Sequence, residues 1–350
     1  MYNIPVCRPL LPTLSAISPY LQRIDAARLY TNQGPLVELL ERRLAAHFNV
    51  DHTNVACVSS ATMGLMLALL ACNVGIGSEC NLPSWTFAAS AHAILAAGLR
   101  PRIIDVEPST GTLSPQWLDA RSAADDAPVT LVVSLFGAPI DISSWTTWTE
   151  KRGRKVVIDA AGGFDTVVPS ALPTVVSLHA TKALTSAEGG FVICTDVCLM
   201  DRIREARNFG FSVTRSSQHA GFNGKMSEYH AAVGNVALDG WPLTREKFER
   251  VIRRYSSGLG IARQSWVSAT AMFSLAGNVE RAESELSKIH IETRRWWARG
   301  LHTHPAFLDY CNGLYPHTET QSNQHLGLPC YVDLQPQTID KIVTTLERAL

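Results

Sequence analysis

Lys182 is the residue whose surroundings most directly suggest chemistry. It lies in a turn between two apolar segments, residues 174–178 and 190–195, and small residues surround it. Burial lowers the pKa of a lysine, and the neutral amine is the form that makes a Schiff base. A lysine whose stem packs on the surface while its amine stays in water is the ordinary alternative for any single lysine.

Asp159 ends the apolar segment 155–159 and is followed by two alanines and two glycines. A carboxylate at the end of an apolar strand is half buried, so it needs a cationic or hydrogen-bonding partner. A protonated pyridine nitrogen is one such partner, and the cationic ring is the better electron sink. A helix cap or a structural ion pair explains an isolated aspartate equally well.

A short run of small and hydroxyl residues, Ser59-Ser60-Ala61-Thr62, separates the apolar segment 54–59 from an apolar stretch at 63–71. Small residues let backbone N–H groups approach an anion, and the positive end of a following helix attracts it. Ordinary capping of that helix is the simpler explanation for the run taken alone.

These signals gain force in combination. An anion cradle, a strand-end aspartate and a strand-end lysine would serve the phosphate, the ring nitrogen and the aldehyde of pyridoxal 5′-phosphate (PLP). His179, three residues before Lys182, is interpreted as a satisfied core histidine in preference to a general acid or phosphate donor. The segment 221–228 indicates only a loop followed by a helix.

The elements that would position these residues alternate between strands and helices. Strands are expected at residues 54–59, 79–83, 102–106, 130–135, 155–159, 174–178 and 190–195. Helices are expected between and after them, at 36–48, 63–71, 87–97, 198–207 and 226–238, and a short helix is expected before them, around 14–26. This alternation favours an α/β domain with a mostly parallel sheet that is covered on both faces.

The pattern changes near residue 240. A long helix is expected at 245–259, strands become few until 328–332, and an amphipathic helix is expected at 337–350. We therefore predict an N-terminal arm at 1–35, a large domain at 36–240 and a small C-terminal domain at 241–350.

Charge and composition exclude several classes of protein. The chain of 350 residues carries 31 basic and 31 acidic side chains, and 46% of its residues are hydrophobic. A balanced charge disfavours nucleic-acid and anionic-membrane partners. The longest apolar run, near 65–72, is too short to span a bilayer.

Eight cysteines are scattered through apolar segments without a C-x-x-C pair. This distribution is typical of buried thiols, so neither disulfides nor a metal site are expected. With no basic segment followed by an apolar stretch at the N-terminus, we also expect no signal peptide and a cytoplasmic location.

Several motifs, in this order along the chain, carry a family resemblance. They are Arg8-Pro-Leu-Leu-Pro12, Thr31-Asn-Gln-Gly-Pro35, Pro83-Ser-Trp-Thr-Phe87, Phe136-Gly137, Ile158-Asp-Ala-Ala161, Ser177-Leu-His-Ala-Thr-Lys182, Glu188-Gly-Gly190, Arg207-Asn-Phe-Gly210 and Asn223-Gly-Lys-Met-Ser-Glu228. Through them nearly the whole chain resembles the DegT/DnrJ/EryC1/StrS family of PLP-dependent aminotransferases, most closely its nucleotide-sugar 4-aminotransferases. The resemblance implies the α/β fold type I of aspartate aminotransferase. That fold has a large domain with a mostly parallel sheet and a small C-terminal α+β domain.

The resemblance also implies roles for two residues already singled out. Lys182 matches the Schiff-base lysine, which moves the proton between the donor α-carbon and the C4′ carbon of the cofactor. Asp159 matches the carboxylate that holds the pyridine nitrogen.

Five further cofactor contacts follow from the same resemblance. Ala61 and Thr62 match the phosphate-binding pair, and Ser177 matches a hydroxyl near that phosphate. Phe87 falls where an aromatic ring stacks on the cofactor. Asn223 matches an asparagine that reaches the cofactor phosphate of a partner subunit, so a homodimer with shared active sites is implied.

Two features depart from the family pattern. Gly162 stands where most members have His or Gln near the ring hydroxyl of the cofactor. The segments 163–174 and 258–286 are shorter than usual or hard to match, and both could reshape the acceptor pocket.

The implied reaction is transfer of an amino group from L-glutamate to a keto group, C4 being favoured, of a nucleotide-linked deoxysugar. The alternatives are amination of a non-nucleotide ketone or cyclitol, and a non-catalytic PLP-binding regulator. Five cations are candidates for the nucleotide diphosphate: Arg207, Arg215, Lys225, Arg294 and Arg295.

Overall fold

The computed structural model describes residues 2–121, 127–275 and 279–349. Its centre is a seven-stranded sheet with the strand order β1-β7-β6-β5-β4-β2-β3. The strands are β1 (Val55–Val58), β2 (Glu79–Pro83), β3 (Arg100–Ile104), β4 (Val129–Val133), β5 (Lys155–Asp159), β6 (Thr174–Ser177) and β7 (Gly190–Ile193). Only β7 runs antiparallel to its neighbours in this sheet. The predicted mostly parallel α/β architecture is confirmed.

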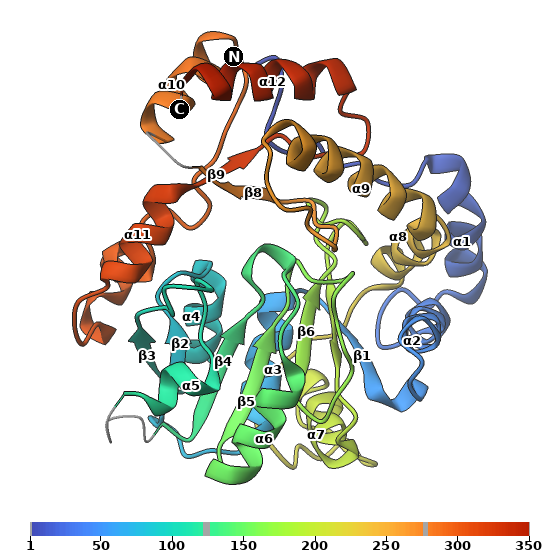
Figure 1. Cartoon of the computed structure of the whole chain (residues 1–350). Coiled ribbons are helices and arrows are strands. Elements are labelled where there is room, and N and C mark those ends of the chain that lie inside the picture. The colour runs from blue at the N-terminus through green and yellow to red at the C-terminus, as the bar shows by residue number, and fades with distance from the viewer. Residues whose placement is uncertain (1, 122–126, 276–278, 350) are drawn as a thin grey trace.

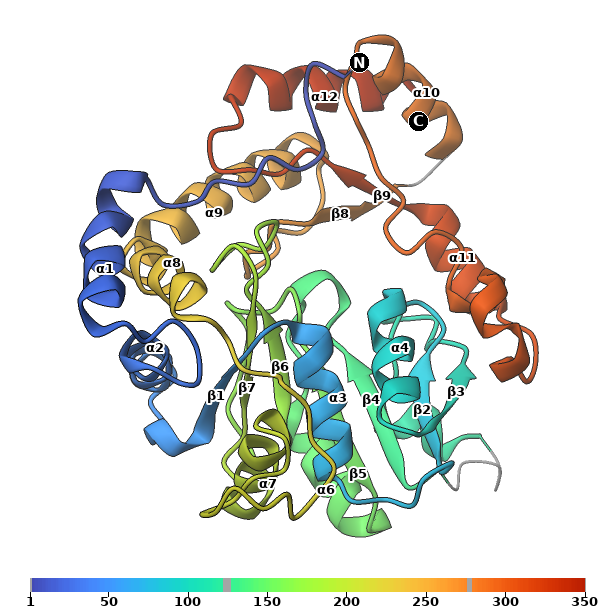
Figure 2. The same ribbon diagram turned by 180° about the vertical axis from the view of Figure 1, so that it is seen from behind.

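The strands are mostly apolar because both faces of the sheet are covered. Alternate residues of β1 show this: Val55 and Cys57 belong to one buried cluster, and Ala56 and Val58 belong to the other. On one face lie α3 (Ala61–Ala71), α4 (Ala88–Ala96) and α7 (Val197–Arg207) (Figure 2). The other face is covered by α2 (Pro35–His47), α5 (Pro115–Asp119) and α6 (Ile142–Arg152) (Figure 1).

A second group of elements lies beyond the carboxyl ends of the parallel strands (Figure 1). It contains α9 (Trp241–Gly258), α10 (Val279–Lys288), α12 (Pro336–Ala349), β8 (Ala271–Ser274) and β9 (His325–Leu328). The strands β8 and β9 form a two-stranded antiparallel sheet. An α+β unit therefore faces the sheet edge at which parallel α/β proteins bind ligands.

The N-terminal segment ties itself to this unit. The Asn3 amide donates to the His290 carbonyl at 2.9 Å, and the Cys330 amide donates to the Val6 carbonyl at 3.0 Å. The chain then enters α1 (Leu14–Ala27), which packs on α8 (Glu228–Asp239). The predicted boundaries at residues 35 and 240 stay predictions.

Some elements differ from expectation. The strand expected at 328–332 is instead β9, which ends at Leu328, and the partner strand β8 was not anticipated. Helix α6 was also missed, because its Ser, Thr and Trp residues have modest helix propensity and only Trp145 and Trp148 are buried. The other unanticipated elements are α5, α10, α11 (Pro316–Gln324) and four 3₁₀ helices at His52–Asn54, Leu135–Gly137, Leu301–Thr303 and Pro305–Tyr310.

Within the described ranges, no helix is both long enough and apolar enough to cross a membrane.

Candidate active site

A cavity of about 350 Å³ lies between the carboxyl edge of the sheet and the α+β unit. Residues from the ends of β1, β4, β5 and β6 line it, together with residues 269–270 and 296–297 from the C-terminal part of the chain. Six of the seven predicted site residues line this cavity: Ala61, Thr62, Phe87, Asp159, Ser177 and Lys182. The sheet thus brings together side chains that are more than 100 residues apart in sequence.

Asn223 does not line this cavity. It is exposed and forms an isolated antiparallel bridge with Asn208, on the loop that leads into α8. Its predicted contact with the cofactor of a partner subunit stays a prediction.

The anion cradle forms where β1 ends and α3 begins. The Ser60 side chain caps α3 by accepting a hydrogen bond from the Met63 amide at 3.1 Å, so it serves the helix itself. Ala61 and Thr62 follow in the first turn, where backbone N–H groups have no partner within the helix. Gly190 pairs with Val58 at the end of β1 and with Ser177 at the end of β6, so Ser177 lies close to this cradle. A Cβ on Gly190 would lie 2.9 Å from the Ala61 nitrogen, so only glycine allows this approach.

Asp159 projects from the end of β5 and is 6% exposed. Its Oδ2 accepts a hydrogen bond from Ser90 Oγ at 2.7 Å, and its Oδ1 accepts one from the Ala161 amide at 3.1 Å. Burial raises the pKa of Asp159, while these two donors and the charge of Lys182 act in the opposite direction. An acidic group is therefore held in a fixed orientation at the cavity wall.

Lys182 lies in the turn that joins β6 to β7. Its backbone amide donates to the His179 carbonyl at 2.9 Å, and the Ala180 amide donates to the Ala187 carbonyl at 2.8 Å, which closes the turn. Burial lowers the pKa of Lys182, and the nearby Asp159 carboxylate partly offsets this. The predicted desolvated lysine is thus present, and its neutral form is favoured relative to a lysine in water.

His179 corrects one interpretation. Its side chain is 45% exposed and lines the cavity, so it is not a core histidine. The Thr181 amide donates to Nδ1 at 3.2 Å, which leaves the proton on Nε2, 3.4 Å from Glu188 Oε1. The histidine and the glutamate thus form a polar pair on the wall of the cavity.

An aromatic wall was not anticipated. The rings of Phe136 and Trp297 stack with centroids 4.3 Å apart and an interplanar angle of 22°, and both line the cavity. Trp85 contacts both rings edge-on from behind. The motif Phe136-Gly137 was visible in the sequence, but no local pattern could place residue 297 against it, because the two lie on different units.

None of the five candidate cations lines the cavity. Arg207 is excluded from contact with a nucleotide diphosphate, because its guanidinium is 1% exposed and donates to Glu41 and to the Cys57 carbonyl. Lys225 donates to Asn208 Oδ1 at 3.2 Å.

The two arginines in the C-terminal part of the chain are also engaged. Arg294 pairs with Glu292 at 2.9 Å, and Arg295 pairs with Glu283 at 2.7 Å. The remaining candidate, Arg215, is exposed.

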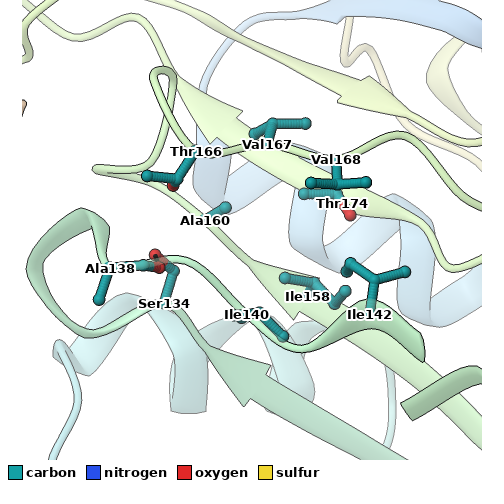
Figure 3. Close-up of a pocket in the computed structure, with 10 residues that line it drawn as sticks. All are labelled: Ser134, Ala138, Ile140, Ile142, Ile158, Ala160, Thr166, Val167, Val168 and Thr174. Atoms are coloured by element: carbon teal, nitrogen blue, oxygen red, sulfur yellow. Dashed lines mark hydrogen bonds between the residues drawn. The ribbon is translucent and has the colours of Figure 1, made fainter. Parts of the chain in front are cut away.

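A smaller pocket lies beside the active-site cavity and shares Ser134 with it (Figure 3). It is lined mainly by aliphatic side chains, among them Ile140, Ile142 and Ile158. Its volume of about 10 Å³ holds at most one water molecule, so it is not a substrate site.

Comparison with known proteins decides the family. The model of the DegT/DnrJ/EryC1/StrS aminotransferase family matches residues 15–347. The chain belongs to this family. As a family member it has the fold and the cofactor class of the PLP-dependent aminotransferases, as its relatives and structural neighbours also indicate.

Two curated relatives represent different substrate classes. A dTDP-4-amino-4,6-dideoxy-D-glucose transaminase from Shigella dysenteriae is 30% identical over 67% of this chain and 64% of its own length. An L-glutamine:2-deoxy-scyllo-inosose aminotransferase from Streptomyces fradiae is 33% identical over 55% of this chain and 50% of its own length. The matches to these two relatives span less than two thirds of their lengths.

Two solved structures superpose over 99% of this chain. A protein from Bacillus cereus ATCC 10987 that is named a putative PLP-dependent aminotransferase matches with a TM-score of 0.90 at 25% identity, over all of its own chain. DesI, crystallised in the presence of its TDP-sugar product, matches with a TM-score of 0.88 at 27% identity, over 93% of its chain.

The cavity of this family member fits PLP on its own geometry. The cradle that a Cβ on Gly190 would fill suits a phosphate, and the oriented Asp159 suits a ring nitrogen. The desolvated Lys182 suits the aldehyde, and it lies in the same cavity. Among the described residues, no group of three or more His, Cys, Asp and Glu side chains is arranged to hold a metal ion.

Proposed function

We propose that this protein transfers an amino group from L-glutamate to the keto group of a nucleotide-linked deoxysugar, at C4, with Lys182 as the lysine that binds PLP covalently. One observation carries the proposal: Lys182, Asp159 and the Ala61–Thr62 cradle line a single cavity. Its volume of about 350 Å³ is in the range of small-molecule sites.

Each of these residues has a task that its surroundings suit. Bound PLP supplies an electron-withdrawing ring that stabilises negative charge at the α-carbon of the amino donor. Asp159 keeps a positive charge on the ring nitrogen, because its carboxylate is fixed by two donors. The Lys182 amine takes the proton from the donor α-carbon and delivers it to the C4′ carbon, and it does the reverse for the acceptor.

The remaining predicted contacts complete the cofactor site. Ala61, Thr62 and Ser177 hold the phosphate, and Phe87 covers one face of the ring from the cavity wall. The side chain of Phe87 is 61% exposed, so cofactor binding would bury an aromatic surface that is now open.

A sugar acceptor is supported by the relative from Shigella dysenteriae and by the TDP-sugar product of DesI. A cyclitol acceptor is the second candidate. It is favoured by the Streptomyces fradiae relative and by the position of the five candidate cations, none of which lines the cavity. To bind the diphosphate of a nucleotide sugar in this cavity, the protein would therefore need cations other than these five.

The first experiment records the absorption spectrum of purified protein with PLP, before and after L-glutamate, for the wild type and Lys182→Ala. We expect a visible band of lysine-bound cofactor that glutamate bleaches in the wild type and that is absent from the variant. Lys151→Ala, which removes an exposed lysine, is the matched control and should behave as the wild type. A band that survives in Lys182→Ala would contradict the assignment.

A second assay discriminates the acceptors. Protein converted to the amine form by glutamate is mixed with a TDP-linked 4-keto-6-deoxyhexose or with a keto-cyclitol, and the return of the visible band is followed. Return with the nucleotide sugar alone supports the proposal, and return with the cyclitol alone supports the second candidate. Binding of PLP without any glutamate reaction would favour a regulatory protein.

We also propose a homodimer in which Asn223 completes the site of the partner subunit. Its support is the exposed position of Asn223 beside the half-exposed Phe222. Mixing refolded Lys182→Ala and Asn223→Ala subunits tests this, because each mixed dimer would contain one site with both native residues. Activity should return on mixing, and its failure to return would contradict a shared site.

A further inference from the structure

Asp159 receives a hydrogen bond from a chain of two buried hydroxyl groups. Ser90 is fully buried, and its Oγ lies 2.7 Å from Asp159 Oδ2. Thr86 is 2% exposed, and its Oγ1 lies 2.9 Å from Ser90 Oγ. Thr86 lies in the link between β2 and α4, and Ser90 lies in the first turn of α4, whereas Asp159 ends β5.

The chemistry of the carboxylate gives this chain one direction. An ionised carboxylate only accepts hydrogen bonds, so the single Ser90 proton points to Asp159. Ser90 then has only lone pairs for Thr86, so the Thr86 hydroxyl is the donor in their bond. The order of donation is therefore Thr86 to Ser90 to Asp159, and donors in series strengthen one another.

The chain compensates for the burial of a charge. An ionised carboxyl group without partners is costly inside a protein, and it tends to take up a proton. Asp159 Oδ1 is held by the Ala161 amide at 3.1 Å, so Ser90 supplies the matching donor to the other oxygen. Lys182 is the charged group that acts on Asp159 in addition to these donors.

We propose that Thr86 and Ser90 are positioning residues that keep Asp159 ionised and aimed at the ring nitrogen of bound PLP. Ser90 bonds Asp159 from outside the residues that line the cavity. Thr86 is one of the lining residues, but its link to Asp159 runs through Ser90, and the role proposed for it is this indirect one. This inference rests on the proposed function, since it assigns the partner of Asp159 to the cofactor ring.

The test measures PLP affinity and the absorption spectrum of the bound cofactor in Ser90→Ala, Thr86→Val and Thr86→Ser. Ser90→Ala removes the donor and should weaken PLP binding about tenfold or more, with a changed ratio of the absorption bands. Thr86→Val keeps the shape of Thr86 but not its donor, and a weakening of about two- to fivefold is expected. Thr86→Ser keeps the hydroxyl and should restore wild-type values.

Ser84→Ala is the structural control. Ser84 is also fully buried and hydrogen-bonded, to His302 Nδ1 at 2.6 Å, but it does not contact Asp159. A positioning role requires that Ser90→Ala changes the spectrum and PLP affinity while Ser84→Ala, at a similar loss of thermal stability, does not. Equal effects of the two substitutions would overturn the inference.

The outcomes separate this inference from the proposed function. Failure of the wild type to bind PLP would remove both. Normal PLP binding and normal spectra in Thr86→Val and Ser90→Ala would remove the inference alone. If Ser90→Ala does not fold, Thr86→Val alone still tests the inference, because valine has the same shape as threonine.

Discussion

Arg207 Nη1 lies 2.6 Å from Glu41 Oε1, in a buried ion pair that closes the free edge of β1. Glu41 accepts a hydrogen bond from the Cys57 amide at 2.8 Å, and Arg207 donates to the Cys57 carbonyl at 2.5 Å. At Cys57 the pair thus replaces a neighbouring strand for the outward-facing backbone of this edge strand. The pair also joins α2, α7 and β1, so Arg207, the first residue of the motif Arg207-Asn-Phe-Gly210, has a structural role.

We predict that Glu41→Ala destabilises the protein by about 3–5 kcal/mol, because it leaves the Arg207 charge buried without its partner. The measurement is urea denaturation of the wild type and the variant. Glu246→Ala, which removes an exposed glutamate, is the control and should change stability by less than about 1 kcal/mol. At temperatures where Glu41→Ala is folded, the KM for the acceptor should be unchanged. A raised KM with normal stability would mean that Arg207 contacts substrate after all.

Lys182 should make the stability of the apoenzyme depend on pH in a defined direction. Burial lowers its pKa, so between its folded and unfolded pKa values the folded protein binds fewer protons than the unfolded chain. The contribution of Lys182 to stability therefore improves as pH rises through that window, toward the ordinary lysine value near 10.4.

The corresponding prediction is that Lys182→Met stabilises the apoenzyme near neutral pH by on the order of 1 kcal/mol, and that the gain shrinks at alkaline pH. Urea midpoints over a pH series provide the measurement, with Lys151→Met as the exposed control. A gain that stays constant at all pH values would show that packing, and not the charge of Lys182, is responsible.

Gly190 is expected to be sensitive because it lies against the phosphate cradle. A Cβ there would be 2.7 Å from the Val176 carbonyl oxygen and 2.9 Å from the Ala61 nitrogen. Gly190→Ala should cost about 1–3 kcal/mol of stability and should weaken PLP binding at temperatures where the variant is folded. Thermal denaturation and PLP titration measure the two effects. Gly313→Ala, with no heavy atom within 4 Å of its Cβ, should leave both unchanged.

Gly162, in contrast, has room for a side chain. Its Cβ would approach the Gly137 nitrogen at 3.4 Å, an ordinary contact, and the residue lines the cavity. We predict that Gly162→Gln folds with a change of less than about 1 kcal/mol, retains PLP and raises the KM for the acceptor, because the new side chain occupies part of the cavity.

Gly137→Ala provides the contrast for this prediction. Its Cβ would lie 2.6 Å from the Gly162 carbonyl oxygen, and its φ is +94°, so substitution there should be clearly destabilising. Thermal denaturation and steady-state kinetics distinguish the two variants. Equal destabilisation of both would mean that Gly162 serves the backbone and not the cavity.

The sequence by itself determined the sheet and the main chemical groups. Strands that are buried on both faces carry an uninterrupted apolar stretch, so strands such as those expected at 155–159 and 190–195 can be recognised without knowledge of their partners. Polar residues at the ends of such strands, Asp159 and Lys182 above all, then had to share one edge of the sheet. The motifs, by their order along the chain, also indicated the family and its cofactor class.

The tertiary structure decided what depends on contacts between distant segments. It paired Arg207 with Glu41, stacked Trp297 on Phe136 and placed Ser90 behind Asp159. It also brought His179 to the cavity and left Asn223 outside it. These outcomes have no local pattern, because the burial and partners of a side chain depend on which segments pack together, and that is settled only when the whole chain has folded.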